Sequence, residues 1–117
     1  ERLQYTRPAN SLSFSYAMVE EAIKRIPYIP DAVVCEDDDV ARNVALVLLQ
    51  RDPQAAKRVV ITGFNNTLDA DFFKSDILTV DVRIEEMGRR LVKSVIDRVK
   101  CPTMDISVTT IATYPKI

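Results

Sequence analysis

A run of four acidic residues, Glu36 to Asp39, directly follows the apolar stretch "DAVVC" and is the most charged cluster in the chain. Carboxylates at the end of a strand can hold a hard cation such as Mg²⁺. They can also form a phosphoacceptor pocket like that of receiver domains. The simpler interpretation is structural, because acids that begin a helix cap its amides and complement its dipole. Consecutive residues leaving a strand point in different directions, so at most one of these acids is expected to face a ligand.

A second polar pair follows another apolar stretch, in "RVVITGFNNT" (residues 58–67). The valines and isoleucine suit a strand that is covered on both faces. Gly63 is expected to let the backbone turn sharply as this strand ends. Asn65 and Asn66 then fall at the carboxyl end of a sheet, where open α/β folds bind ligands. Asparagine also tolerates left-handed backbone, so a plain turn remains the alternative to a ligand site.

The sequence offers little for catalysis. The chain has no histidine, which argues against zinc sites and excludes histidine as a general base. Its two cysteines, Cys35 and Cys101, form neither a disulfide framework nor a metal-binding pattern. With only Gly63 and Gly88, a phosphate-cradling glycine loop cannot be built in the usual way. We therefore expect no enzymatic activity, no cofactor and no metal.

Length and composition indicate one small globular domain of 117 residues, 47% hydrophobic and 28% charged. A net charge of -1 gives no basic stripe for nucleic acid. The longest apolar stretch, Val44 to Leu49, is far shorter than a membrane span. The chain starts at Glu1 without a methionine, so its true N-terminus is expected to have been removed. A reduced, soluble, intracellular domain is the expectation.

The elements that must position these candidate residues alternate between strand and helix. We expect a helix over residues 16–26, a strand over 31–35, a helix over 39–50, a strand over 58–63, a short turn of helix near 68–73 and a strand over 77–82. Ser11 or Ser13 can cap the first helix. Strands separated by helices predict an α/β fold with a parallel sheet flanked by helices and right-handed crossovers.

The longest helix has the clearest pattern. From Ile84 to Val99, apolar residues recur at offsets 0, 3, 7, 8, 11, 12 and 15, which is an unbroken amphipathic stripe. Acidic residues come early and basic residues late, as the helix dipole favours. Pro102 follows the helix, and "DISVTTIATY" is expected to close the chain as a β-rich segment.

Three motifs in this order resemble the C-terminal part of LacI/GalR-family transcriptional regulators. They are "PDAVVCEDDDVARNVALVLL", "VVITGFNNT" and "ILTVDVRIEEMGRRLVKSVIDRV". The family typically shows a strand ending in Cys-Ala-Asn-Asp, then Val-Gly-Phe-Asp-Asp, and then a Leu-Thr-Thr-Val strand before a helix that begins near Met-Gly. Each motif alone is weak, but three at the right spacing over nearly the whole chain are fairly specific.

The resemblance implies a fragment of a periplasmic-binding-protein-like (type I) effector domain, whose two lobes close on a small molecule. Residues 1–76 would form most of the C-terminal lobe, 77–100 a crossover and a helix of the other lobe, and 101–117 the returning C-terminal segment. It also implies a cytoplasmic homodimer that binds DNA only through a helix-turn-helix absent from this chain. A sugar is the ligand class that the family leads us to expect.

Three positions are carried over to the effector site by this resemblance. Asp37 falls at the ligand-contacting Asn of Cys-Ala-Asn-Asp, and Asn65 at the first Asp of Gly-Phe-Asp-Asp, so acid and amide have exchanged places. Asn10 stands about where many members place an aromatic that stacks on the ligand. Val82 replaces a frequent glutamine at the lobe crossover. The strand that usually carries a ligand-clamping arginine would precede Glu1.

Surplus apolar residues match the family's dimer-forming region. The expected dimer-interface residues are Val44, Val47, Leu48, Phe72 and Phe73. A lobe without its partner would also expose the stripe from Ile84 to Val99, which predicts self-association or a swapped arrangement.

Two alternative functions remain beside the LacI-type regulator. One is a periplasmic solute-binding protein of the same fold, which shares the pocket but not the DNA-binding module. The other is a receiver-like or Mg²⁺-dependent α/β domain that uses Asp37 and Asp38. The receiver alternative is the weaker of the two, because no second acidic strand end and no lysine occupy convincing places.

Overall fold

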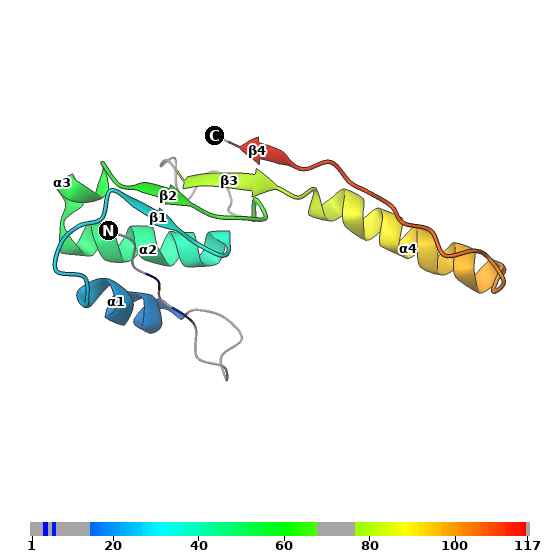
Figure 1. The fold of residues 1–117 in the computed structure, drawn as a ribbon, viewed down its shortest axis with the longest axis horizontal. Helices are drawn as coiled ribbons and strands as arrows, with labels where there is room; N and C mark the ends of the chain where they lie inside the picture. The colour runs from blue at the N-terminus through cyan, green and yellow to red at the C-terminus, as the bar shows by residue number, and fades with distance from the viewer. Residues whose placement is uncertain (1–3, 5, 7–14, 68–76, 117) are drawn as a thin grey trace.

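The computed structural model of the chain describes residues 4, 6, 15–67 and 77–116. Its elements follow the predicted alternation (Figure 1). They are α1 (Tyr16–Lys24), β1 (Ala32–Val34), α2 (Asp38–Arg51), α3 (Pro53–Ala56), β2 (Val60–Thr62), β3 (Ile77–Asp81), α4 (Ile84–Lys100) and β4 (Tyr114–Lys116). The helix expected near 68–73 lies outside the described residues.

The strands form one sheet in the order β1-β2-β3-β4. The first three strands are parallel, with Val33 opposite Ile61 and Ile61 opposite Ile77. The last strand is antiparallel to β3, with Val80 opposite Pro115. The α/β class is confirmed, but the sheet is mixed rather than purely parallel, because the chain returns from the far end of α4 before it pairs.

Local side-chain chemistry explains where the first helices begin. The hydroxyl of Ser15 caps α1 by accepting from the Met18 amide at 3.4 Å, so the predicted caps Ser11 and Ser13 were wrong. The helix predicted over 39–50 is confirmed as α2. The short α3 was not predicted, although Pro53 at its first position and Asp52 as its cap are typical of a helix start.

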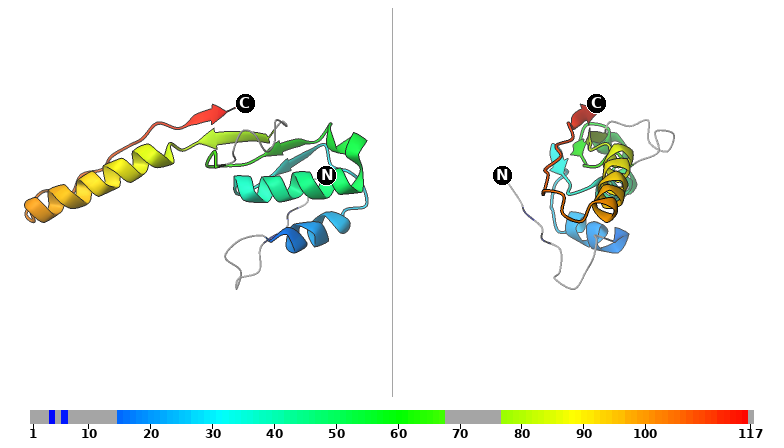
Figure 2. Two further views of the ribbon diagram at one scale, coloured as in Figure 1. Left: turned by 180° about the vertical axis from the view of Figure 1, so that it is seen from behind. Right: turned by 90° about the vertical axis from the view of Figure 1, so that its right-hand side faces the viewer.

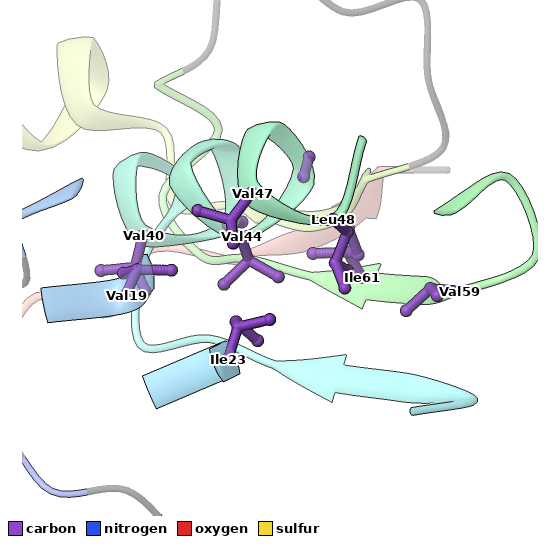
Figure 3. Close-up of a cluster of buried hydrophobic side chains, with 10 residues drawn as sticks. Val19, Ile23, Val40, Val44, Val47, Leu48, Val59 and Ile61 are labelled. Atoms are coloured by element: carbon purple, nitrogen blue, oxygen red, sulfur yellow. The ribbon is translucent and has the colours of Figure 1, made fainter. Parts of the chain in front are cut away.

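The hydrophobic core lies between α1, α2 and β2 (Figure 3). Val19 and Ile23 come from α1 and pack with the inner face of α2, and Ile61 comes from β2. The neighbouring Val60 points to the other face of the sheet and is 47% exposed. The expectation that both faces of this strand are covered was therefore wrong for the described part of the chain.

Three residues expected at a dimer interface belong to this core. The exposed fractions of Val44, Val47 and Leu48 are 4%, 4% and 0%. They face α1 and the sheet, so they have no surface left to offer to a partner chain, and that expectation is corrected. The other two, Phe72 and Phe73, lie outside the described residues.

Helix α4 and residues 101–113, which lead back from it, form an arm. The arm projects from the packed region, which consists of α1, α2, α3 and the sheet (Figures 1 and 2). The arm gives the chain extents of 59 × 32 × 25 Å and a radius of gyration of 18.5 Å, against roughly 13 Å for a compact domain of this length. The apolar residues of α4 are between 41% and 74% exposed. Residues 105–114 were expected to be β-rich, but of these only Tyr114 belongs to a strand, β4 (Tyr114–Lys116).

Candidate functional site

The three parallel strands end at one edge of the sheet, where their loops are held together by backbone hydrogen bonds. The Asp38 amide donates to the Phe64 carbonyl at 3.2 Å, which joins the start of α2 to the loop after β2. The Asn65 amide donates to the Val80 carbonyl at 3.1 Å and joins that loop to β3. The predicted site residues Asp37 and Asn65 are therefore brought to the same carboxyl edge, as the sequence indicated.

Asp37 is a helix cap. Its Oδ1 accepts from the Val40 amide at 2.8 Å, and Asp37 is the N-cap of α2. Asp39 is exposed and lies 3.3 Å from the Arg42 guanidinium, a surface ion pair of small energy. For these two acids the structural interpretation of the acidic run agrees with their contacts.

Asp38 was predicted only as one of the acids of the Mg²⁺-dependent alternative, and its structural role was not foreseen. It is fully buried, at 0% exposure. Its Oδ1 accepts from the Thr79 hydroxyl at 2.7 Å, and its Oδ2 accepts from the Thr67 amide at 2.7 Å and the Thr67 hydroxyl at 3.5 Å. One carboxylate thus bonds to the loop after β2 and to the middle of β3. The lone threonine in the apolar run "ILTVDV" was the only sequence signal of this partner.

Gly63 is required for a different reason from the one predicted. In the described chain no glycine has a positive φ, so Gly63 does not supply a left-handed turn. Instead, a Cβ at this position would lie 2.2 Å from Asp38 Oδ1 and 3.1 Å from Asp38 Cα. The absence of a side chain lets the buried carboxylate pass directly beneath β2.

The turn itself is made by the two asparagines. Asn65 has φ 95° and Asn66 has φ 55°, the left-handed region that asparagine enters more readily than most residues. The Asn66 amide donates to the Thr79 hydroxyl oxygen at 3.3 Å. Asn65 is therefore a turn residue at the carboxyl edge, while the predicted Asn10 lies outside the described residues.

An open hollow of about 540 Å³ lies beside this turn, where β3 passes into α4. The strand side is lined by Asn65, Asn66, Thr67 and Asp81. The helix side is lined by Arg83, Ile84, Glu85, Glu86 and Arg89. Asp37 is not among the lining residues, so in this arrangement only one of the two carried-over positions in the described chain borders the hollow.

Charged groups line the helix side of the hollow. A hydrogen bond from Arg90, 2.7 Å from Glu86 Oε1, lowers the pKa of that carboxyl from its ordinary value. Arg83 has a left-handed backbone with φ 54°, and its amide donates to Asp81 Oδ1 at 2.7 Å. The first turn of α4 has no side-chain cap at Arg83. The hollow is therefore polar and hydrogen-bonding in character.

Metal chemistry has little support among the residues that the structure describes. They include no group of three or more His, Cys, Asp or Glu side chains placed to hold a metal ion.

Burial, and to a lesser degree the charge of Asp37, raises the pKa of the Cys35 thiol to about 12. None of the described helices is long and apolar enough to span a membrane.

The chain has the fold of a periplasmic-binding-protein-like domain, and residues 1–116 match the model of that family. It belongs to that family. It is 30% identical over 99 residues to the HTH-type transcriptional repressor MelR of Bacillus subtilis, covering 85% of this chain and 28% of the repressor. It is 28% identical over 75 residues to the lactose operon repressor of Klebsiella pneumoniae, covering 64% and 21%.

Solved structures agree on the fold. A LacI-family regulator from Sanguibacter keddieii matches with a TM-score of 0.72 at 20% identity, covering 91% of this chain and 41% of that one. A LacI-family regulator from Enterococcus faecium with bound ribose matches with a TM-score of 0.71 at 18% identity, covering 87% and 37%. The chain is thus a fragment of a LacI-type effector domain, which confirms the resemblance. It spans about a quarter of the length of the curated relatives it matches.

Proposed function

We propose that this chain contributes one side of the effector site of a LacI-type regulator, which binds a free sugar and thereby changes operator binding by a helix-turn-helix elsewhere in the protein. The observation that carries the proposal is the left-handed Asn65–Asn66 turn, which borders the polar hollow at the carboxyl edge of the sheet. Carboxylates and amides offer the paired acceptors and donors that sugar hydroxyls require. Relatives of this fold were solved with bound ribose and with cellobiose.

The mechanism is a population shift between two arrangements of the lobes. Asn65 belongs to the packed region, and Glu85 and Arg89 belong to the arm, yet all three border one hollow. A ligand that contacts both sides in only one arrangement favours that arrangement, and the preference is passed to the DNA-binding module. In this proposal residues 1–76 act with the C-terminal lobe, 77–100 cross to the other lobe and 101–117 return.

Thermal unfolding of the full-length parent protein tests the sugar. Ribose, glucose, sucrose and cellobiose, the sugars bound in related structures, are the probes. A ligand at a hundred times its Kd stabilises the folded state by about 2.7 kcal/mol. We expect one of them to raise the Tm of the parent and of Asn43→Ala, a control on α2, but not of Asn65→Ala. Equal shifts in both variants would remove Asn65 from the site.

Operator binding provides the second half of the test. The sugar that stabilises the parent should change its affinity for operator DNA, and that change should be lost in Asn65→Ala while sugar-free affinity is kept. A sugar that binds without changing DNA affinity, or a full-length precursor that begins with a signal peptide, would favour the solute-binding alternative. The relatives named above are repressors, which supports the regulator and argues against an enzyme.

The proposed regulator is a cytoplasmic homodimer. Since the inner face of α2 is buried in the core, its contribution to a dimer would come from outer residues such as Leu49, which is 39% exposed, together with Phe72 and Phe73. The Mg²⁺-dependent alternative has less support, because Asp37 caps a helix and Asp38 is fully engaged in internal hydrogen bonds. Thermal stabilisation of the parent by MgCl₂ alone, lost in Asp37→Ala, would reverse this preference.

A further inference from the structure

We propose that Asp38 is the positioning residue of the effector site: its buried carboxylate holds the Asn65–Asn66 turn in its left-handed conformation without touching the ligand. The inference rests on the proposed function for its consequence, but its geometry stands on the residues already described. Asp38 is fully buried and does not line the hollow, and its carboxylate bonds to Thr67, which follows the turn, and to Thr79 of β3.

A relay of hydrogen bonds runs from this carboxylate to the turn. The Asn66 amide donates to Thr79 Oγ1 at 3.3 Å, and the Thr79 hydroxyl donates onward to Asp38 Oδ1 at 2.7 Å. The Thr67 amide donates to Asp38 Oδ2 at 2.7 Å. Two consecutive backbone amides, those of Asn66 and Thr67, therefore depend on one side chain. Residues outside glycine seldom hold positive φ angles, so two in succession need such external support.

The capacity of the residue to accept hydrogen bonds matters as much as its shape. All the groups around the two oxygens are donors: one amide and two hydroxyls. A carboxylate accepts from all of them, whereas an asparagine would direct its own NH₂ group at one of these donors. Hydrogen bonds to a buried carboxylate are also stronger than those between neutral groups. An aspartate suits this position better than any side chain of equal size.

Gly63 gives an independent view of the same requirement. A Cβ there would lie 2.2 Å from Asp38 Oδ1, so an alanine at position 63 cannot coexist with the carboxylate in its present place. Because Gly63 does not have a positive φ, this steric relation is the reason for glycine that the structure shows. Gly63→Ala should therefore reproduce the effect of changing Asp38 while leaving every polar group of the relay in the sequence.

Hydrogen exchange and sugar titration of the full-length parent test the proposal together. The variants are Asp38→Asn, Thr79→Val and Gly63→Ala. The matched controls are Asp39→Asn, an exposed acid one residue along, and Thr79→Ser, which keeps the hydroxyl. We expect the Asn66 and Thr67 amides to exchange about tenfold faster in the three variants, while the Val40 amide, capped by Asp37, is unchanged. Controls should behave like the unmodified protein.

The sugar titration distinguishes a positioning role of Asp38 from a purely structural one. For whichever of ribose, glucose, sucrose or cellobiose binds the unmodified parent, the Kd should rise about tenfold in Thr79→Val and return in Thr79→Ser. Operator affinity without sugar should stay constant. A normal exchange rate at Asn66 and Thr67 in Thr79→Val, or faster exchange with an unchanged sugar Kd, would each overturn the proposal.

Failure of the proposed function would look different. If none of the four sugars binds the unmodified parent, the sugar proposal fails before any variant is compared, and with it the role of Asp38 toward these sugars. The hydrogen-exchange measurement still decides whether Asp38 holds the turn, because it needs no ligand. Should Asp38→Asn reduce stability too far, a comparison of Thr79→Val with Thr79→Ser still tests whether the hydrogen bonds from Asn66 through Thr79 to Asp38 hold the turn.

Discussion

Helices α2 and α4 carry the same kind of apolar stripe but end in opposite environments. Val44, Val47 and Leu48 of α2 are at most 4% exposed, because α1 and the sheet enclose them. Leu91 and Val95 of α4 are 61% and 63% exposed, since no other described element packs on that face. An amphipathic pattern shows that a face must be covered, and says nothing about which segment covers it.

The contrast also explains the shape of the chain. The apolar face of α2 contacts α1 and the sheet and so forms a core. The apolar face of α4 is exposed, and the helix projects as an arm that gives the chain its large radius of gyration. The chain spans only about a quarter of the length of the curated relatives it matches.

Thiol reactivity should separate the two regions most strongly. Cys35 follows β1 in the packed region, and Cys101 is exposed at the end of α4. Since the pKa of the Cys35 thiol is raised from 9.0 to about 12, its thiolate fraction near pH 8 is about a thousandfold lower than that of an ordinary thiol. Alkylation with iodoacetamide, followed by mass spectrometry, should modify Cys101 first by a large factor. Comparable rates would show that the packed region opens readily.

The same raised pKa predicts an effect of alkaline pH on stability. Between about 9 and about 12 the unfolded thiol loses its proton while the folded thiol keeps it, so the unfolded state binds fewer protons. The stability of the packed region should therefore fall as the pH rises through this window. In Cys35→Ala this part of the pH dependence should be absent, as urea unfolding at several pH values would show.

Shortening a leucine should cost far more in α2 than in α4. Leu48→Ala leaves a cavity in the core and is expected to lower the free energy of unfolding by about 3 kcal/mol. At concentrations low enough to keep the chain monomeric, Leu91→Ala should change it by less than about 0.5 kcal/mol, because that side chain is exposed. In the full-length parent the two losses should become similar. A large loss for Leu91→Ala in the 117-residue chain would contradict the arm's exposure.

The exposed stripe should make the isolated chain associate with itself. Replacing Leu91 and Val95 together by serine is expected to weaken that association about tenfold, because it removes apolar area from the contact. Lys93→Ser, which removes an exposed ion pair with Asp97, is the control. Sedimentation velocity over a range of concentrations gives the measurement, and a chain that stays monomeric at high concentration would refute the prediction.

Loss of the helix cap should have the smallest effect. Asp37→Ala removes the acceptor of the Val40 amide and is expected to cost about 1 kcal/mol of stability in the packed region. Asp39→Ala, whose side chain is mostly exposed, should be nearly neutral. Chemical denaturation of both variants under the same conditions compares them. Equal effects would mean that Asp37 acts through its charge rather than as a cap.

Much of this fold could be predicted from the sequence. The order of strands and helices, the bounds of α2 within one residue and the left-handed asparagines all follow from local patterns. Such patterns depend on neighbouring residues, and the sequence displays these directly. The α4 stripe was equally clear, which is why its exposure could be anticipated once the chain was read as a fragment.

The candidate site was less predictable because it depends on contacts between distant positions. Asp38 and Thr79 are 41 residues apart, and no local pattern shows that one carboxylate reaches both β3 and the loop after β2. The reason for Gly63 was misjudged on the same ground, since steric conflict with Asp38 exists only in the folded sheet. The assignment of α2 residues to a dimer interface came from the family resemblance, and it failed because Val44, Val47 and Leu48 pack into the core of this chain.

The left-handed Arg83 joins the packed region to a helix of 17 residues, which is about 25 Å long. That geometry makes α4 a lever that turns about its junction with β3 at Arg83, while residues 101–113 lead back from its far end to β4. A rotation of about ten degrees there displaces the Lys100 end by roughly 4 Å, as follows from the rise of an α-helix. A change in the hollow that leaves the sheet unaltered would thus move the far end of α4 by a distance comparable to the length of a side chain.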